Sequence, residues 1–162
     1  MSDLDALLAQ VRLAVFDFDG VFTDNRVWTS ERGEESVACW RGDGLGLRRL
    51  DEVGVGYVIV STEANSAVAA RARKLRAACV NDVPDKLVVL REQAAERGVG
   101  LDRVAYLGND INDADCLRAV GLPVVPADAW PEVVPLARWV LERRGGEGCV
   151  REFCDALWRV QS

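Results

Sequence analysis

Histidine is absent from this chain of 162 residues. Its absence excludes a Ser-His-Asp triad, a metal centre with imidazole ligands and general acid–base catalysis by imidazole. Any chemistry must therefore come from carboxylates, lysine, hydroxyls, thiols or a bound metal ion. The five cysteines form no C-x-x-C pair, which argues against a zinc site or a redox motif. We expect them to be reduced thiols in a cytoplasmic protein.

Long hydrophobic runs are also missing. No apolar stretch approaches the roughly 20 residues that cross a bilayer, and the acidic residues 1–10 do not resemble a signal peptide. The formal charge of −6 argues against nucleic-acid binding, which relies on clustered Lys and Arg. A small anionic substrate remains compatible, because a bound cation and a few local bases outweigh distant charges. We therefore expect neither a membrane nor a nucleic-acid partner.

What the chain does contain is a regular alternation of apolar and amphipathic segments. The apolar runs predict strands at residues 11–16, 55–60 and 104–107, with shorter ones near 78–80 and 122–125. The amphipathic segments predict helices over residues 44–53, 64–77, 84–97, 113–119 and about 150–158. Pro84 suits the first turn of its helix, and Asp43 is expected to cap the first of these helices or, alternatively, to face the substrate. This order predicts an α/β fold: one domain over residues 1–162, Rossmann-like, with a parallel sheet and helices on both faces.

Residues 21–40 interrupt this alternation. Two strand-like pieces, around residues 26–29 and 36–40, flank a polar turn at 30–34. The pattern predicts a β-hairpin inserted directly after the first strand. Trp28 and Trp40 fall on this hairpin and suit a subunit interface.

Polar side chains follow each of the three strong strands. They are Asp17 and Asp19, then Ser61 and Thr62, then Asn109 and Asp110. Because the carboxyl ends of parallel strands share one edge of a sheet, we expect these side chains to converge. Taken singly, each pair also suits an ordinary turn or helix cap. Their joint occurrence in this order favours a site.

The chemistry of these residues points to phosphate and a divalent cation. Asp17 and Asp19 at the end of a buried strand are costly unless a cation offsets their charge. Ser61, just before a predicted helix, offers a hydroxyl and main-chain amides to phosphate. Lys86 is placed to neutralise the same group, although alone it also suits a solvated surface. The oxygen-rich turn at 108–113 carries the ligands that Mg²⁺ prefers.

These residues, in this order, resemble the haloacid dehalogenase (HAD) superfamily: D-x-D at the first strand, Ser or Thr at the second, a Lys, then an acidic turn. The resemblance implies a Mg²⁺-dependent phosphatase in which Asp17 attacks phosphorus and forms an aspartyl-phosphate. Asp19 would protonate the leaving alcohol and then deprotonate water. Ser61, Thr62 and Lys86 would bind the phosphoryl oxygens.

The resemblance also implies a ligand set for the metal ion. Asp17, the main-chain carbonyl of Asp19 and Asp110 would bind Mg²⁺. Many HAD proteins carry Asp where this chain has Asn109, so we assign the acidic ligand to Asp110, with Asp113 behind it. An oxygen of the Asn109 side chain is the alternative ligand.

A narrower resemblance covers nearly the whole chain. Residues 19–24, 41–46 and 144–152 are similar to those of capless sugar-acid phosphatases. This group includes 3-deoxy-octulosonate 8-phosphate phosphatase, keto-deoxynononate 9-phosphate phosphatase and a domain fused to some acylneuraminate cytidylyltransferases. The resemblance implies that there is no cap domain. It also implies a homotetramer in which the hairpins form a central barrel and a neighbouring subunit completes each active site.

Residues 61–63 discriminate within this group. Octulosonate 8-phosphate enzymes usually carry Thr-Gly-Arg there, whereas Glu63 together with Arg71 and Lys74 resembles the nonulosonate (sialic-acid-type) branch. In that branch the Glu contacts substrate hydroxyls and the basic pair meets the sugar carboxylate, including across a subunit boundary. The alternative is that these residues form the charged face of a surface helix.

We therefore expect a phosphatase of a nonulosonate 9-phosphate that acts in sialic-acid biosynthesis. Hydrolysis of octulosonate 8-phosphate is the nearest alternative. Two others are a promiscuous phosphatase of small esters and a non-catalytic tetramerising partner of a cytidylyltransferase.

Overall fold

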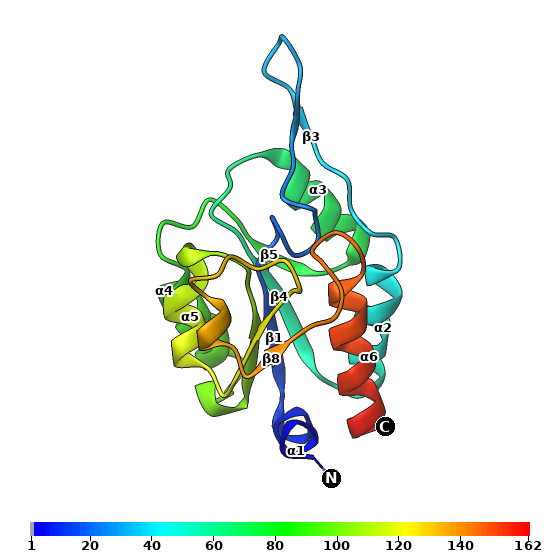
Figure 1. The fold of residues 1–162 in the computed structure, drawn as a ribbon, viewed down its shortest axis with the longest axis vertical. Coiled ribbons are helices and arrows are strands. Elements are labelled where there is room, and N and C mark those ends of the chain that lie inside the picture. The colour runs from blue at the N-terminus through cyan, green and yellow to red at the C-terminus, as the bar shows by residue number, and fades with distance from the viewer. Residues whose placement is uncertain (1) are drawn as a thin grey trace.

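A six-stranded sheet between two layers of helices forms the body of the molecule in the computed structural model, which describes residues 2–162 (Figure 1). The sheet strands are β1 (Leu13–Phe16), β4 (Gly56–Val60), β5 (Ala78–Val80), β6 (Val104–Leu107), β7 (Leu122–Val125) and β8 (Trp139–Val140). The helices are α1 (Asp3–Gln10), α2 (Asp43–Glu52), α3 (Ser66–Leu75), α4 (Lys86–Glu96), α5 (Ala114–Ala119) and α6 (Cys149–Gln161).

The strand order is β5-β4-β1-β6-β7-β8, and every pair is parallel. β1 lies between β4 and β6. After β1 the strands are added outward on one side of it (β4, β5) and then on the other side (β6, β7, β8). Such a switch point is where ligands bind in open parallel sheets, outside the carboxyl ends of the strands. The order confirms the predicted α/β Rossmann-like fold, and residues 2–162 contain no large cap domain.

The sheet residues alternate between the two helix layers. Ala14 and Phe16 pack toward α1, α2, α3 and α6, whereas Leu13 and Val15 pack toward α4 and α5. Both layers are visible in Figure 1, with α4 and α5 on one side and α2 and α6 on the other. The ring of Phe16 meets Phe153 edge to face at a centroid distance of 5.6 Å. Truncating such a core ring costs about 3–5 kcal/mol, so this packing holds the end of β1 in place.

Several elements differ from the sequence predictions. The helix α1 was not predicted; it begins at a capping box in which Ser2 and Asp5 exchange hydrogen bonds. β8 was also not predicted. Pro84 precedes α4 instead of lying in its first turn, because Asp85 is the N-cap and accepts hydrogen bonds from the next turn. Asp43 does not cap α2, whose N-cap is Gly42.

The predicted hairpin is present but has short strands. β2 (Trp28–Thr29) pairs with β3 (Glu35–Ser36), and a single bridge joins Thr23 to Cys39 at its base. Figure 1 shows the hairpin projecting well beyond the sheet, at the end where β1 finishes. The Trp28 side chain is 76% exposed there. Within residues 2–162, no helix is long and apolar enough to cross a membrane.

Candidate active site

Asp17 and Asp19 lie directly beyond β1, where the chain turns away from the sheet. The main-chain N–H of Asp17 still donates to Leu107 of β6 (2.9 Å), so the sheet positions this buried residue. Gly20 follows at φ 80°, and a Cβ atom there would collide with the Asn109 side chain. Glycine therefore permits the turn that brings both carboxylates to one hollow of about 130 Å³.

Lys86 is buried beneath this hollow and pairs with two carboxylates. Its Nζ lies 2.8 Å from Asp17 Oδ1 and 2.8 Å from Asp113 Oδ1. Burial lowers the pKa of Lys86, but the two carboxylates outweigh burial and raise it above its ordinary value. Lys86 is thus a fixed cation beside Asp17 and not the solvated surface lysine that the sequence alone also allowed.

Asp113 organises the turn that follows β6. Its Oδ1 accepts a hydrogen bond from Tyr106 Oη (2.6 Å), and its Oδ2 accepts from the main-chain N–H groups of Asn109 (2.8 Å) and Asp110 (3.3 Å). One buried carboxylate therefore sets the positions of the turn and of Lys86. Tyr106 was not predicted, because an apolar strand pattern does not reveal which hydroxyl reaches a neighbouring carboxylate.

Asn109 meets two of the three groups that were predicted to bind metal, Asp17 and the main-chain oxygen of Asp19. One end of its side-chain amide lies 3.0 Å from Asp17 Oδ2 and 3.0 Å from the main-chain oxygen of Asp19. With nitrogen at that end, the amide donates two hydrogen bonds. With oxygen there, three oxygens face one point, and such a set of hard ligands suits Mg²⁺.

The predicted ligand Asp110 lines the same hollow as Asp17 and Asp19. Its Oδ1 accepts a hydrogen bond from the N–H of Ile111 at 2.7 Å. Within residues 2–162, no three His, Cys, Asp or Glu side chains form a metal-binding group. A set that includes a main-chain carbonyl and an amide oxygen needs no such cluster, so the residues present fit a magnesium ion.

The two catalytic candidates have raised pKa values. Burial raises the pKa of Asp17 well above its ordinary value, Asp113 raises it further, and Lys86 opposes them. Burial also raises the pKa of Asp19, and the charge of Glu63 adds to the effect. A raised pKa suits a carboxyl group that must donate a proton near neutral pH. A nucleophile must instead be ionised, so Asp17 requires a cation beside it.

The phosphate-binding candidates lie on the loop after β4. Ser61 is buried, and its Oγ accepts a hydrogen bond from the N–H of Glu63 at 3.1 Å. Thr62 and Glu63 line the same hollow as Asp17. The expected cradle at a helix N-terminus is wrong in detail, because α3 begins only at Ser66 with Asn65 as its N-cap.

A second hollow of about 170 Å³ continues from the first toward the base of the hairpin. The two hollows share Asp19, Asn25 and Glu63, and the second adds Arg26 and Glu35. Asn25 and Arg26 were not predicted as site residues. They reach the site because the hairpin leads the chain past it, and the sequence pattern does not reveal that path.

Arg71 and Lys74 are not brought to Asp17 within this chain. They line a separate hollow of about 450 Å³ together with Arg41 and Arg48. The guanidinium of Arg71 donates a hydrogen bond to the main-chain oxygen of Trp40 at 3.2 Å. The hollow of this pair shares no lining residue with the hollows at Asp17 and Asp19.

Known proteins similar to this chain were found by sequence and by structure. No family model matches it. A 3-deoxy-D-manno-octulosonate 8-phosphate phosphatase from Yersinia pestis is 34% identical over 154 residues, covering 94% of this chain and 82% of that protein.

Two solved structures share the fold closely. A protein from Streptomyces avermitilis, described as a HAD family hydrolase, is 41% identical with a TM-score of 0.88, over 91% of this chain and 84% of that one. A 3-deoxy-D-manno-octulosonate 8-phosphate phosphatase from Moraxella catarrhalis, solved with a magnesium ion, a phosphate ion and a KDO molecule, is 26% identical. Its TM-score is 0.94 over 99% of this chain and 93% of that one.

Proposed function

The chain belongs to the HAD superfamily, in the group that includes 3-deoxy-D-manno-octulosonate 8-phosphate phosphatases, and from this premise we propose that it hydrolyses the terminal phosphate of a nonulosonate 9-phosphate. As a member of this group it is a Mg²⁺-dependent phosphoric monoester hydrolase. The proposal concerns the nine-carbon substrate and the roles of individual residues.

Asp17 is the nucleophile in the proposed reaction. One of its carboxylate oxygens bonds to phosphorus while the bond from phosphorus to the sugar oxygen breaks, and Asp19 gives its proton to that leaving oxygen. Ionised Asp19 then takes a proton from water, whose oxygen attacks the phosphorus and releases inorganic phosphate and free Asp17. Ser61, Thr62 and Lys86 bind the phosphoryl oxygens, and Lys86 already lies 2.8 Å from the nucleophile.

The proposed metal ligands are Asp17, the main-chain oxygen of Asp19 and the side-chain oxygen of Asn109. The distances of 3.0 Å from one Asn109 atom to both other ligands support Asn109 in this set, in place of Asp110, the ligand first expected. Bound Mg²⁺ would offset negative charge at Asp17 and on the phosphoryl group.

One observation carries the choice of substrate: Glu63 lines both hollows, beside Asp19 in the first and at the base of the hairpin in the second. A sugar whose phosphate lies at Asp17 extends its chain past this residue. Carboxylates accept hydrogen bonds from sugar hydroxyls, and Glu35 and Asn65 in the second hollow offer further acceptors. An Arg at position 63, as octulosonate enzymes usually have, would instead donate hydrogen bonds to the sugar.

Octulosonate 8-phosphate is the second candidate substrate, since the curated relative from Yersinia pestis is named for it. For either substrate, we propose that Arg71 and Lys74 of one subunit meet the sugar carboxylate held by another. This arrangement would require an oligomer, and we propose a homotetramer, as the resemblance to the sugar-acid phosphatases implies, in the cytoplasm. The nonulosonate product would be a precursor of a sialic-acid-like sugar.

The test compares kcat/KM for keto-deoxynononate 9-phosphate and 3-deoxy-D-manno-octulosonate 8-phosphate with Mg²⁺, and with the metal chelated as control. We expect the nine-carbon ester to be preferred, and Glu63→Arg to shift the ratio toward the eight-carbon ester. Glu92→Arg makes the same charge change on the exposed surface of α4 and should leave the ratio unchanged. A clear preference of the native chain for the eight-carbon ester would establish the second candidate instead.

The nucleophile is tested separately. Asp17→Asn should abolish turnover of both esters while the protein still folds, because the amide fills the same space without a buried charge. Undiminished activity in this variant would contradict the assignment of Asp17.

A further inference from the structure

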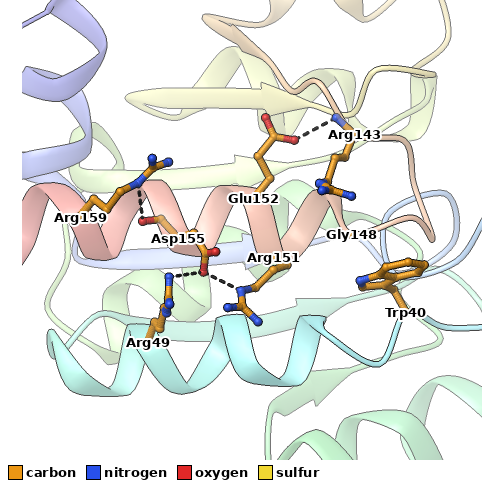
Figure 2. A pocket seen from close by; sticks show the side chains of 8 residues that line it. All are labelled: Trp40, Arg49, Arg143, Gly148, Arg151, Glu152, Asp155 and Arg159. Carbon is orange, nitrogen blue, oxygen red and sulfur yellow. Dashed lines mark hydrogen bonds and ion pairs between the residues drawn. The ribbon is translucent and has the colours of Figure 1, made fainter.

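A fourth hollow lies between α2 and α6 and shares no lining residue with the two hollows at Asp17 (Figure 2). Its volume is about 430 Å³, which falls within the range of roughly 300–1,000 Å³ for small-molecule sites. Four arginines line it: Arg49 on α2, Arg143 before α6, and Arg151 and Arg159 on α6. We refer to it as the arginine hollow.

The arginine hollow has a surplus of positive charge. Asp155 and Glu152 are the only carboxylates among its lining residues, against four guanidinium groups. Asp155 Oδ1 pairs with Arg49 at 2.8 Å and with Arg151 Nε at 2.7 Å. Glu152 uses its two oxygens to accept the main-chain N–H groups of Glu142 (3.0 Å) and Arg143 (2.9 Å). The surplus over the lining carboxylates is therefore two charges.

Two of the guanidinium groups have no carboxylate partner within residues 2–162. Arg143 Nη1 donates to the main-chain oxygen of Glu147 at 3.4 Å, and Arg159 Nε donates to the main-chain oxygen of Asp155 at 3.3 Å. These are weak contacts for groups that each carry five donors. Arg143 and Arg159 lie toward opposite ends of the arginine hollow, as Figure 2 shows, so positive charge extends along it in a chain whose formal charge is −6 overall.

The other two arginines are held in place by the fold. Arg151 donates through Nε to Asp155 and through Nη1 to the main-chain oxygen of Gly42. Arg49 lies over the ring of Trp158, 4.6 Å from its centroid. A guanidinium that is already positioned loses little conformational freedom when it binds an oxyanion. The N-terminus of α6, at Gly148 without a side-chain cap, adds positive potential.

Trp40 forms one end of the arginine hollow, as Figure 2 shows. Its ring lies close against Gly42 and Gly148: a Cβ atom at these glycines would be 2.9 Å and 3.1 Å from Trp40 Nε1. The side chain is nevertheless 44% exposed. An indole fixed in this way offers an apolar face next to the charged groups.

We propose that the arginine hollow binds the phosphate dianion of a small phosphorylated molecule, whose organic part contacts Trp40. The surplus of two positive charges matches a dianion, and a single guanidinium group can donate two parallel hydrogen bonds to phosphate oxygens. Free phosphate and a phosphate ester both carry the group that the hollow would bind, and the experiment below distinguishes these two ligands.

The test follows the indole N–H signal of Trp40 by NMR in the ¹⁵N-labelled full chain at pH 8, without Mg²⁺ and at constant ionic strength. Trp40→Phe assigns the signal. Inorganic phosphate, ribose 5-phosphate and adenosine 5′-monophosphate are the three probes. We expect a saturable shift of the Trp40 signal. Tighter binding of an ester than of inorganic phosphate identifies a phosphorylated metabolite, and equal binding identifies free phosphate.

The double variant Arg143→Gln, Arg159→Gln removes the two guanidinium groups that lack a carboxylate partner. Affinity should fall about tenfold or more, because charge-assisted hydrogen bonds are lost. The control Arg91→Gln, Arg118→Gln makes the same charge change on α4 and α5 and should stay within about twofold, since distant surface charges are screened. Unchanged phosphatase activity verifies folding, and the single variants repeat the test if the double variant unfolds. A Trp40 signal that no probe moves, or an affinity that the Gln substitutions leave unchanged, overturns the proposal.

Discussion

Asp43 provides a sharp test of how the body of the protein is held together. It is fully buried at the start of α2, and its Oδ1 accepts a hydrogen bond from the main-chain N–H of Arg151 on α6 at 3.1 Å. Its Oδ2 has no hydrogen-bond partner within residues 2–162. Burial raises the pKa of Asp43 from 3.8 to about 7, although the bond to Arg151 opposes the shift. The folded state therefore binds a proton that the unfolded state releases.

The sign and size of the effect follow from linkage. Because the carboxyl group is protonated in the folded chain but ionised in the unfolded chain between pH 4 and pH 7, the free energy of unfolding falls as the pH rises through this window. At about 1.4 kcal/mol for each pKa unit, the full penalty is about 4.5 kcal/mol above pH 7. Asp43→Asn removes the titration and keeps an acceptor for Arg151. Relative to the native chain, the variant should gain about 2.5 kcal/mol between pH 5 and pH 8.

Urea unfolding at a series of pH values, followed by circular dichroism, measures this difference. Any constant cost of placing an amide in the site cancels when the two pH values are compared. Glu52→Gln removes an exposed carboxylate from the same helix and serves as the matched control, with a difference that stays nearly constant. A flat difference for Asp43→Asn between pH 5 and pH 8, or one that grows toward low pH, would refute the reasoning from burial.

Three further predictions concern the active site. Lys86→Met leaves the buried carboxylates of Asp17 and Asp113 unpaired, so urea unfolding should show a loss of about 3–5 kcal/mol, and turnover should be abolished; native stability in this variant would contradict the buried ion pairs. Asn109→Asp places a further acidic group beside Asp17, so the melting temperature should fall without Mg²⁺ and rise more steeply with added Mg²⁺ than in the native chain; an unchanged response would remove Asn109 from the ligand set. Tyr106→Phe deletes the 2.6 Å hydrogen bond to Asp113, so kcat should fall more than KM rises, as determined by steady-state kinetics; identical kinetics would show that Tyr106 does not position the turn.

The parts of the fold that sequence could predict are those with a local signal. Apolar runs followed by polar residues located β1, β4 and β6, and the shared edge of a parallel sheet then predicted that Asp17, Thr62 and Asp110 meet in one hollow. Lys86 shows the limit of local patterns, because a single lysine in a helix is equally compatible with a solvated surface position. Only its place in the resemblance indicated that it belongs to the site, and the burial that the structure shows was not predicted.

The rest depended on contacts between residues far apart in the chain. Asp43 was expected to cap α2, but its carboxylate accepts a hydrogen bond from the main-chain N–H of Arg151, 108 positions away. No local sequence pattern reveals such a contact. The choice between Asn109 and Asp110 is equally non-local, because it depends on how the turn is held by Asp113. The arginine hollow combines side chains from α2 and α6 and was not predicted at all.

The charges around Asp17 determine how a phosphate ester can enter the site. Asp17, Asp19, Glu63 and Asp110 all line the first hollow, and no lysine or arginine is among the described residues that line it. The buried Lys86 contacts Asp17 but is shared with Asp113. A dianionic substrate therefore meets a surplus of negative charge, so a divalent cation is needed for substrate binding as well as for chemistry. The arginine hollow has the opposite surplus and needs no metal. Phosphate binding at Asp17 should consequently require Mg²⁺, whereas binding beside Trp40 should not, and this difference separates the two sites in a single titration.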